Sequence, residues 1–209
     1  MDSTTRSSRL RPSRERGPLI TLTAGPSPPS LSLGNRVNET ETVSKRIDLD
    51  SELESRSIPN DVLHEICRHA LDVAPEECCG LVIGTADDRF LRAVRVTNVM
   101  TKMHVADAKA FPRDARHAYY MSETEYLQAI GEAETRGERV SAIYHSHFGH
   151  GCYLSQDDLA FAAHPLFPFP DAAQLVLSLL GNRVREIGIF EPTGAPEYSF
   201  VGRRLEAAN

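Results

Sequence analysis

The sequence predicts an α/β domain in which a mixed β-sheet carries helices on its faces. The first observation is the order of the expected elements: a helix, a hairpin, a strand, a helix, a strand, a helix and then three strands. The second is that apolar residues follow the helical period in some segments and the two-residue period of strands in others. The third is size, because 209 residues, 41% of them hydrophobic, fit one ordinary domain with an additional segment.

The first 36 residues differ in composition from the rest of the chain. They contain five prolines, seven serines and no aromatic residue, and six arginines stand against Asp2 and Glu15. Such a segment cannot bury enough apolar surface to offset its ordering entropy, so we expect it to be disordered and dispensable for stability. Its Arg- and Ser-rich composition resembles an organelle transit peptide, but it has no clear apolar face, and a tail or an over-extended gene start explains it equally well.

Composition disfavours several classes of function. The chain has a net charge of -6 and its acidic residues, apart from Asp2 and Glu15, lie after the Arg-rich segment, which argues against nucleic-acid binding. It contains no apolar run of 18 residues, so we expect no transmembrane helix and no membrane partner. The four cysteines, Cys67, Cys78, Cys79 and Cys152, lack a Cys-x-x-Cys spacing, which favours a reducing compartment and a cytoplasmic location.

The first half of the domain is expected to begin with a helix and a hairpin. Residues 60–74 form the helix, because their apolar side chains recur at helical spacing and Pro75 ends the pattern. His64 and His69 lie off the apolar stripe and are expected to be solvated. A buried strand at 77–84 and a second strand at 90–98 then form the hairpin.

The middle of the chain is expected to contain a flap, a strand and a helix. Residues 99–114 show no period and are expected to form an irregular, mobile flap near the site. Residues 115–121 predict a strand. Ser122-Glu123-Thr124-Glu125 has the pattern of a capping box and predicts a helix that ends near Gly137.

The last third of the chain predicts three strands, at 174–180, 183–191 and 197–203. The sequence then divides into an N-terminal extension and linker at 1–56, with a short strand near 46–49, a domain at 57–203 and a tail at 204–209.

A candidate metal site lies in residues 139–161. The two-residue alternation there predicts a strand that presents His145 and His147 on one face, and Ser155 opens a helix whose first turn contains Asp158. Two imidazoles and a carboxylate are a three-ligand zinc set that leaves a fourth position for water, as in catalytic sites. Singly these features are weak, because His-x-His occurs on strands without metal and Ser155-x-x-Asp158 is also a helix cap.

The combination of motifs is specific. His145-x-His147, seven residues and Ser155-x-x-Asp158, preceded by Pro75-Glu76-Glu77-Cys78-Cys79-Gly80, resemble the signature of the JAMM (MPN+) zinc metallopeptidases of the prokaryotic JAB type. The resemblance covers roughly residues 57–203. It implies a curved mixed sheet flanked by helices, an architecture related to that of the zinc cytidine deaminases. Deaminase chemistry itself is disfavoured, because the chain has no Pro-Cys-x-x-Cys.

The resemblance also implies roles and a substrate. One Zn²⁺ would be held by His145, His147 and Asp158, with Glu77 as general base and then general acid, and with Ser155 donating to the oxyanion. The expected reaction is hydrolysis of a peptide or isopeptide bond after the Gly-Gly end of a ubiquitin-like or sulfur-carrier protein. The sequence leaves open whether the protein is a homodimer.

Two other functions are weighed against this one. A non-catalytic MPN module that scaffolds a complex shares the fold, but it would not need the intact set of five site residues. A RadC-like member associated with DNA repair ranks third, because His-Ser-His differs from the usual His-Asn-His-Pro and no helix-hairpin-helix segment is visible.

The loop between the ligands departs from the family pattern at three positions. Phe148 and Leu154 stand where proline is usual, and Cys152 stands where a small residue is usual. Loss of the prolines puts the rigidity of this loop in doubt. We expect Cys152 to be a packed residue, and the alternative hypothesis is that its thiolate reaches the open zinc position and holds the enzyme inactive.

Overall fold

The computed structural model describes residues 46–164, 167–194 and 199–208. Residues 1–36, for which composition predicts disorder, lie outside the described residues, and so do positions 197 and 198 of the last predicted strand.

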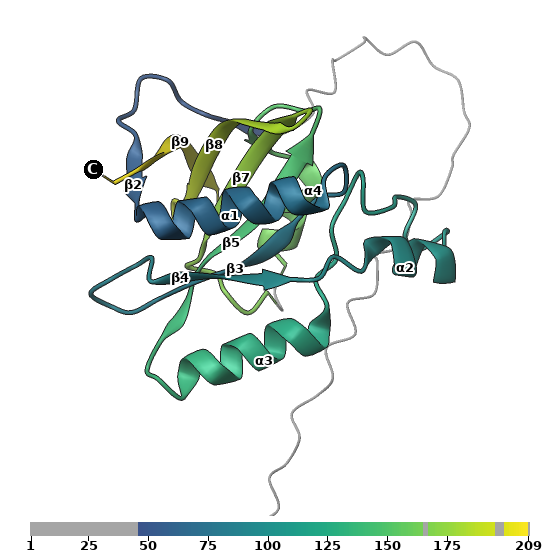
Figure 1. Ribbon diagram of the computed structural model, residues 1–209, viewed down its shortest axis with the longest axis horizontal. Coiled ribbons are helices and arrows are strands. Elements are labelled where there is room, and N and C mark those ends of the chain that lie inside the picture. Colours follow the sequence, from purple (N-terminus) through teal and green to yellow (C-terminus); the bar gives the residue numbers. More distant parts are fainter. Residues whose placement is uncertain (1–45, 165–166, 195–198, 209) are drawn as a thin grey trace, which may run out of the picture.

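A curled seven-stranded sheet forms the centre of the described part, in the order β2-β9-β8-β7-β5-β3-β4 (Figure 1). Its neighbours are antiparallel except for β2 with β9 and β5 with β7, so the predicted mixed sheet and α/β class are confirmed. A separate ribbon pairs β1 with β6. The strands are β1 Ile47–Asp48, β2 Arg56–Ile58, β3 Cys79–Gly84, β4 Arg92–Val96, β5 Arg139–Phe148, β6 Tyr153–Leu154, β7 Ala173–Leu180, β8 Arg183–Pro192 and β9 Phe200–Ala207.

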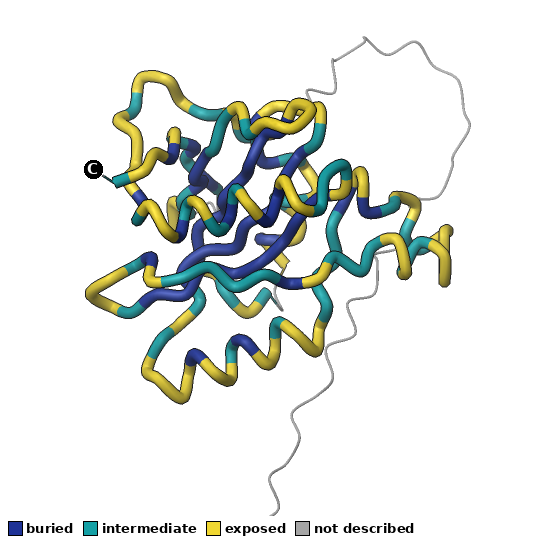
Figure 2. The backbone as a smooth tube through the Cα atoms, viewed as in Figure 1, coloured by how far each residue is buried: buried dark blue, intermediate teal, exposed yellow. Residues whose placement is uncertain are grey.

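Helices lie on both faces of the sheet (Figure 1). They are α1 Asn60–Val73, α2 Met100–Ala106, α3 Glu123–Glu134 and α4 Gln156–Ala162. The apolar stripe of α1 packs on one face, against side chains such as Tyr144 and Leu175. On the other face, α3 packs Ala129 and Ala133 against β3 and β5. Figure 2 shows the result, a buried layer through the middle strands between exposed outer helix surfaces.

A third apolar cluster supports the region of the predicted metal site. It joins β6, β7, β8 and β9 with the start of the described chain and with α4. Its fully buried members include Leu154, Val176 and Phe190, and Ile47 and Leu49 pack against them. The segment that precedes the predicted domain is therefore part of this core.

Four local predictions are wrong. The segment 99–114 contains helix α2, which was not expected because none of its residues is buried and no apolar period marks it. Residues 115–121 are not a strand, because the Ala118 carbonyl and the Tyr120 N–H are bonded to the side chain of Asn98 instead of to a neighbouring strand. The side chain of Ser122 makes no cap bond. His69 is buried at 6% exposure and is not solvated.

The paired strands extend beyond the predicted limits of 57–203. Residues 204–207, which were assigned to a tail, continue β9, and β2 begins at Arg56. The short strand expected near 46–49 is present as β1, and Leu49 adds a bridge to Gly202. Among the described residues, no helix has the length and apolar character needed to cross a membrane.

Candidate metal centre

The central strand β5 carries both predicted histidine ligands. His145 is 0% exposed and His147 is 7% exposed, and the strand is hydrogen-bonded on both sides, to β3 and to β7. Because side chains alternate along a strand, both imidazoles lie on the face of Ile143, whereas Tyr144 packs in the cluster under α1. Two candidate ligands therefore project from a rigid, buried backbone.

Helix α4 supplies the third candidate ligand through its N-terminal cap. The Ser155 hydroxyl accepts from the Asp158 N–H at 3.2 Å, and Asp158 Oδ2 accepts from the Ser155 N–H at 2.8 Å and from the Ser155 hydroxyl at 2.6 Å. This is the predicted capping box, and it satisfies backbone groups at the start of the helix. It holds one carboxylate oxygen and leaves Oδ1 directed at the histidines.

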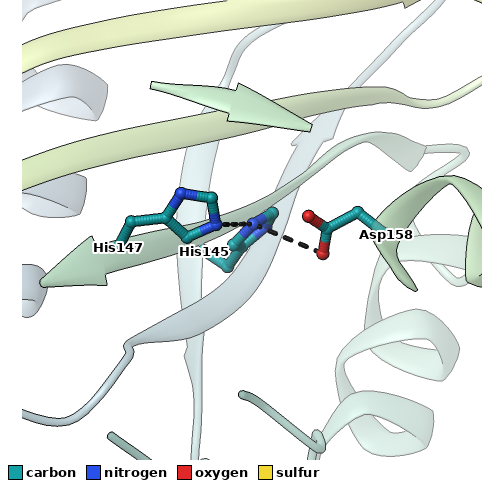
Figure 3. A group of neighbouring side chains, drawn as sticks. All are labelled: His145, His147 and Asp158. Atoms are coloured by element: carbon teal, nitrogen blue, oxygen red, sulfur yellow. Dashed lines mark hydrogen bonds and ion pairs between the residues drawn. The ribbon is translucent and has the colours of Figure 1, made fainter. Parts of the chain in front are cut away.

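The three side chains converge on one point (Figure 3). His145 Nε2 lies 3.2 Å from His147 Nε2 and 3.6 Å from Asp158 Oδ1, and the ligand atoms all lie within 4.8 Å of one another. In a tetrahedral zinc shell with bonds of about 2.0–2.1 Å, neighbouring ligand atoms are about 3.3 Å apart. The spacing and the nitrogen and oxygen donors fit a zinc ion with three protein ligands.

The two histidines are oriented in different ways. His147 Nδ1 lies 3.0 Å from the Gly151 carbonyl, and because a carbonyl can only accept, Nδ1 carries the proton and Nε2 keeps its lone pair for a metal. In the described part of the chain, the buried Nδ1 of His145 has no hydrogen-bond partner. Its ring instead stacks on Tyr119, with centroids 4.7 Å apart and planes 24° apart.

The electrostatics of the cluster favour a cation. Burial alone would raise the pKa of Asp158, but the charge of His145 and hydrogen bonds from His145 and Ser155 hold it well below its usual range. Burial likewise opposes a charge on His145, and the carboxylate of Asp158 outweighs it and raises the pKa. Burial, together with the charge of His145, lowers the pKa of His147 to about 4. An anionic oxygen and a neutral imidazole are thus already in place for a metal.

Glu77 lies beside this cluster, two residues before the start of β3. Cys79 pairs with His145 in antiparallel register, and continuing that register by two residues brings Glu77 opposite His147 on the same face. Its side chain is 7% exposed, and burial raises its pKa to about 7, with the charge of His145 opposing and that of Asp158 adding to the shift. A carboxyl group with this pKa can both accept and release a proton near neutrality.

Cys152 is packed away from the candidate ligands. Its Sγ donates to the Val176 carbonyl at 3.1 Å, and burial raises its pKa to about 12, so the group is a thiol. Within the described residues, the cluster of metal-binding groups contains no cysteine. The arrangement matches the expected packing role. Of the other two unusual loop residues, Leu154 fills the same apolar cluster and Phe148 packs on the side of α1.

Two aromatic residues at the site were not foreseen. Tyr119 stacks on His145, and Tyr153 lies against His147 with ring centroids 5.0 Å apart. Tyr119 belongs to a segment that the sequence had suggested to be a strand, and no spacing linked it to the motif. Tyr153 lies within the motif between the ligands, and its aromatic side chain was the only feature of the sequence that could have indicated a contact with the site.

A family model and a relative of known sequence match the chain. The family model described as prokaryotic homologs of the JAB domain matches residues 59–189. A protein of Caenorhabditis elegans, "Uncharacterized protein F37A4.5", is 28% identical over 123 residues, which are 59% of this chain and 36% of that protein. The chain thus spans about a third of the length of this relative.

Three solved structures are similar to the chain. Protein DSY2949 from Desulfitobacterium hafniense has a TM-score of 0.51 at 20% identity, over 73% of this chain and 93% of that one, which supports the fold alone. A protein from Salinibacter ruber has a TM-score of 0.48 at 22% identity, over 73% and 90% of the two chains. AF2198, a JAB1/MPN domain protein from Archaeoglobus fulgidus, has a TM-score of 0.37 at 14% identity, over 73% and 98%.

Proposed function

Because the chain belongs to the family of prokaryotic homologues of the JAB domain, and because its site has the required groups, we propose that it is a zinc-dependent peptidase. The observation that carries the proposal is the convergence of His145 Nε2, His147 Nε2 and Asp158 Oδ1 beside the buried Glu77. A scaffold module would need neither the ligand atoms at this spacing nor a buried carboxyl group with a raised pKa.

The reaction divides between the metal and the residues of the chain. A bound Zn²⁺ would supply a Lewis acid and lower the pKa of a water ligand. Glu77 would take the proton from the attacking water and give it to the leaving amine, since a buried carboxylate beside the site can act as general base and then as general acid. Ser155 lies at the start of α4, where its hydroxyl is engaged with Asp158, so its oxyanion role requires that the hydroxyl also reaches the substrate.

The proposed substrate is a peptide or isopeptide bond after the Gly-Gly end of a ubiquitin-like or sulfur-carrier protein. Its support is the sequence resemblance to the JAMM peptidases, together with short connections between most elements of the domain. A reducing compartment such as the cytoplasm is proposed for this protein, since all four cysteines are free thiols.

The test compares metal content and cleavage in matched variants. We expect the purified protein to bind one equivalent of zinc and to cleave a Gly-Gly fusion of a sulfur-carrier protein, with loss of cleavage on chelation. His147→Gln should lose zinc by elemental analysis, whereas His150→Gln, which changes an exposed histidine three residues away, should keep it.

A different outcome would favour the scaffold alternative. If the protein contains no stoichiometric zinc, and if zinc addition produces no cleavage of any Gly-Gly fusion, the peptidase proposal is wrong. The family fold would then serve in the assembly of a complex.

A further inference from the structure

We propose that Asn98 is a positioning residue of the metal centre, one that fixes Glu77 and Tyr119 relative to His145. As a role in catalysis, this rests on the function proposed above. Asn98 lies just after β4 and is partly buried, and no sequence motif pointed to it.

The side chain of Asn98 makes four hydrogen bonds to the backbone. Its Nδ2 donates to the Glu77 carbonyl at 2.9 Å and to the Ala118 carbonyl at 3.1 Å. Its Oδ1 accepts from the N–H groups of Met100 and Tyr120, each at 3.0 Å. An asparagine amide has two N–H donors and two acceptor lone pairs, so this side chain is fully used.

The pattern of partners defines which way the amide points. Both partners of the nitrogen are carbonyl groups, which only accept, and both partners of the oxygen are N–H groups, which only donate. The reversed amide would set donor against donor and acceptor against acceptor at all four contacts. A residue that could only donate or only accept would lose two of the bonds.

Asn98 is hydrogen-bonded to the backbone on both sides of Tyr119. The Ala118 carbonyl and the Tyr120 N–H are both bonded to it, so the residue between them is held at both peptide groups. Tyr119 in turn stacks on His145, whose buried Nδ1 has no hydrogen-bond partner in the described part of the chain. A metal-binding imidazole is usually oriented by a hydrogen bond at its second nitrogen. Here the stacked ring takes over that task, and it depends on Asn98.

Asn98 also holds the residue proposed as general base. The Glu77 carbonyl is bonded to Asn98, and the Glu77 N–H donates to the Ala115 carbonyl at 2.7 Å. One peptide group of Glu77 is therefore bonded directly to the segment that includes Tyr119, and the other is joined to that segment through the side chain of Asn98. One side chain thus couples the base, the stacking ring and the ligand His145.

The test uses two substitutions at Asn98 and one control. Asn98→Asp keeps the acceptor bonds and removes both donors, and Asn98→Ser shortens the side chain without adding a charge. Asn182→Asp makes the same chemical change at an exposed position in the two-residue turn between β7 and β8. Thermal melting and the amide NMR spectrum establish that each variant is folded, and Asn98→Ser serves alone if the aspartate variant is not.

The first readout is the NMR signal of the His145 ring in the metal-free protein. Stacking on Tyr119 moves the His145 ring protons upfield, and Tyr119→Leu gives their position without the stacked ring. We expect both Asn98 variants to shift these signals toward that position, and Asn182→Asp to leave them in place. If the signals of both folded variants coincide with those of the wild type, the positioning role is overturned.

The second readout is cleavage by the zinc-loaded protein. We expect kcat to fall about 10- to 100-fold in the Asn98 variants while KM changes little, because they disturb orientation and not substrate binding. If the wild type does not cleave, but the His145 signals shift in both Asn98 variants, the proposed function is overturned and the positioning role is supported. A wild type that cleaves, with variants that match it in kcat and in the His145 signal, overturns the positioning and supports the function.

Discussion

Asp158 uses its two carboxylate oxygens for different purposes. Oδ2 accepts two hydrogen bonds from Ser155 and closes the cap of α4, and Oδ1 faces His145 at 3.6 Å. The two interpretations that the sequence left open for this residue, helix cap and metal ligand, are therefore compatible in one side chain. Because the cap fixes the carboxylate before any metal arrives, less conformational entropy is lost on binding.

Replacement of the proposed general base separates proton transfer from metal binding. Glu77→Gln removes the titratable group without changing its size, so we expect zinc content to be kept and kcat to fall by roughly 10² to 10⁴. Glu76→Gln is the matched control, because Glu76 is exposed and its replacement should leave kcat unchanged. Elemental analysis and steady-state kinetics make the measurement, and wild-type turnover in Glu77→Gln would exclude the mechanism.

Removal of the Cys152 thiol should affect stability and not the rate of cleavage. The buried sulfur belongs to the third apolar cluster and donates to the Val176 carbonyl on β7, so we expect Cys152→Ala to lower the free energy of unfolding by about 1 kcal/mol. Denaturant unfolding and kcat provide the measurement. Faster cleavage by the variant, together with a sulfur ligand in zinc X-ray absorption of the wild type, would instead support a thiolate switch.

The motif residues could be found from the sequence because their spacing along a strand and at a helix start is local. His145 and His147 share a face through the two-residue period, and Asp158 follows from a cap pattern. Tyr119 and Asn98 could not be found in this way. Their importance comes from contacts across loops, which depend on where the segment 99–121 lies in three dimensions and leave no periodic pattern.

At the scale of elements, two helices show that the same capping pattern in the sequence can form a cap or not, depending on groups distant in the chain. Ser122 and Ser155 both open a Ser-x-x-acid pattern, but only Ser155 forms the box. At the first of these helices, the Glu125 carboxylate accepts instead from the Thr97 N–H at 2.7 Å. A partner near the end of β4 thus competes with the local cap, and no local pattern could have revealed it.

This contrast provides a matched pair of serine substitutions. Ser155→Ala removes a formed cap and one clamp on Asp158, so we expect a loss of about 0.5–2 kcal/mol in unfolding free energy. Its zinc affinity should fall about 10- to 100-fold, because the carboxylate is no longer held in place. Ser122→Ala should change neither quantity appreciably. Equal effects of the two substitutions, in unfolding and in zinc titration, would show that the cap of α4 is unimportant.

The elements with a buried face were predicted well, and those without one were not. Helix α1 and strands β3, β5, β7 and β8 were predicted close to their observed limits, since each packs apolar residues at a regular spacing. Helix α2 has no buried residue and was predicted as irregular. Whether the segment around it is mobile, as the sequence suggested, stays a prediction.

At the scale of the whole molecule, a buried histidine links stability to pH. His69 on α1 lies 2.8 Å from the Tyr144 hydroxyl, under the helix. It was expected to be solvated because it falls off the stripe of apolar residues. Burial, with a contribution from the charge of Arg95, lowers its pKa to about 4 from an ordinary value of 6.5.

The sign of the pH effect follows from these values. Between pH 6.5 and about 4 the unfolded chain binds a proton at His69 that the native protein does not, so the unfolding free energy falls as the pH falls. Across this window the wild type should lose on the order of 1–2 kcal/mol of unfolding free energy through His69, and we expect the His69→Gln variant not to show this decrease. Denaturant unfolding of metal-free protein at pH 7 and pH 4.5 measures it. Identical pH slopes for the variant and the wild type would contradict the assignment.

The N-terminal strand of the described chain is attached to the metal loop. Strand β1 pairs with β6, whose Tyr153 lies against His147 and carries the Arg46 guanidinium at 4.8 Å from its ring. A chain that starts near Val43 keeps this ribbon, and one that starts at Asp50 loses it. We expect the chain that starts at Asp50 to melt at a lower temperature, because it loses Ile47 and Leu49 from the third apolar cluster, and to bind zinc more weakly in titration with a competing chelator. Equal zinc affinities of the two folded truncations would contradict the attachment.

The ribbon of β1 and β6 connects the N-terminal part of the chain mechanically to the loop between the ligands. Tension applied through the chain before residue 46 would act on β6, and through Tyr153 and Ser155 on two of the three candidate ligands. A fusion partner, an anchored surface or an unfolding machine that pulls on this end would therefore loosen Asp158 and the packing of Tyr153 on His147 before it opened the seven-stranded sheet. Force on one end of the chain would turn the centre off while most of the fold stayed intact.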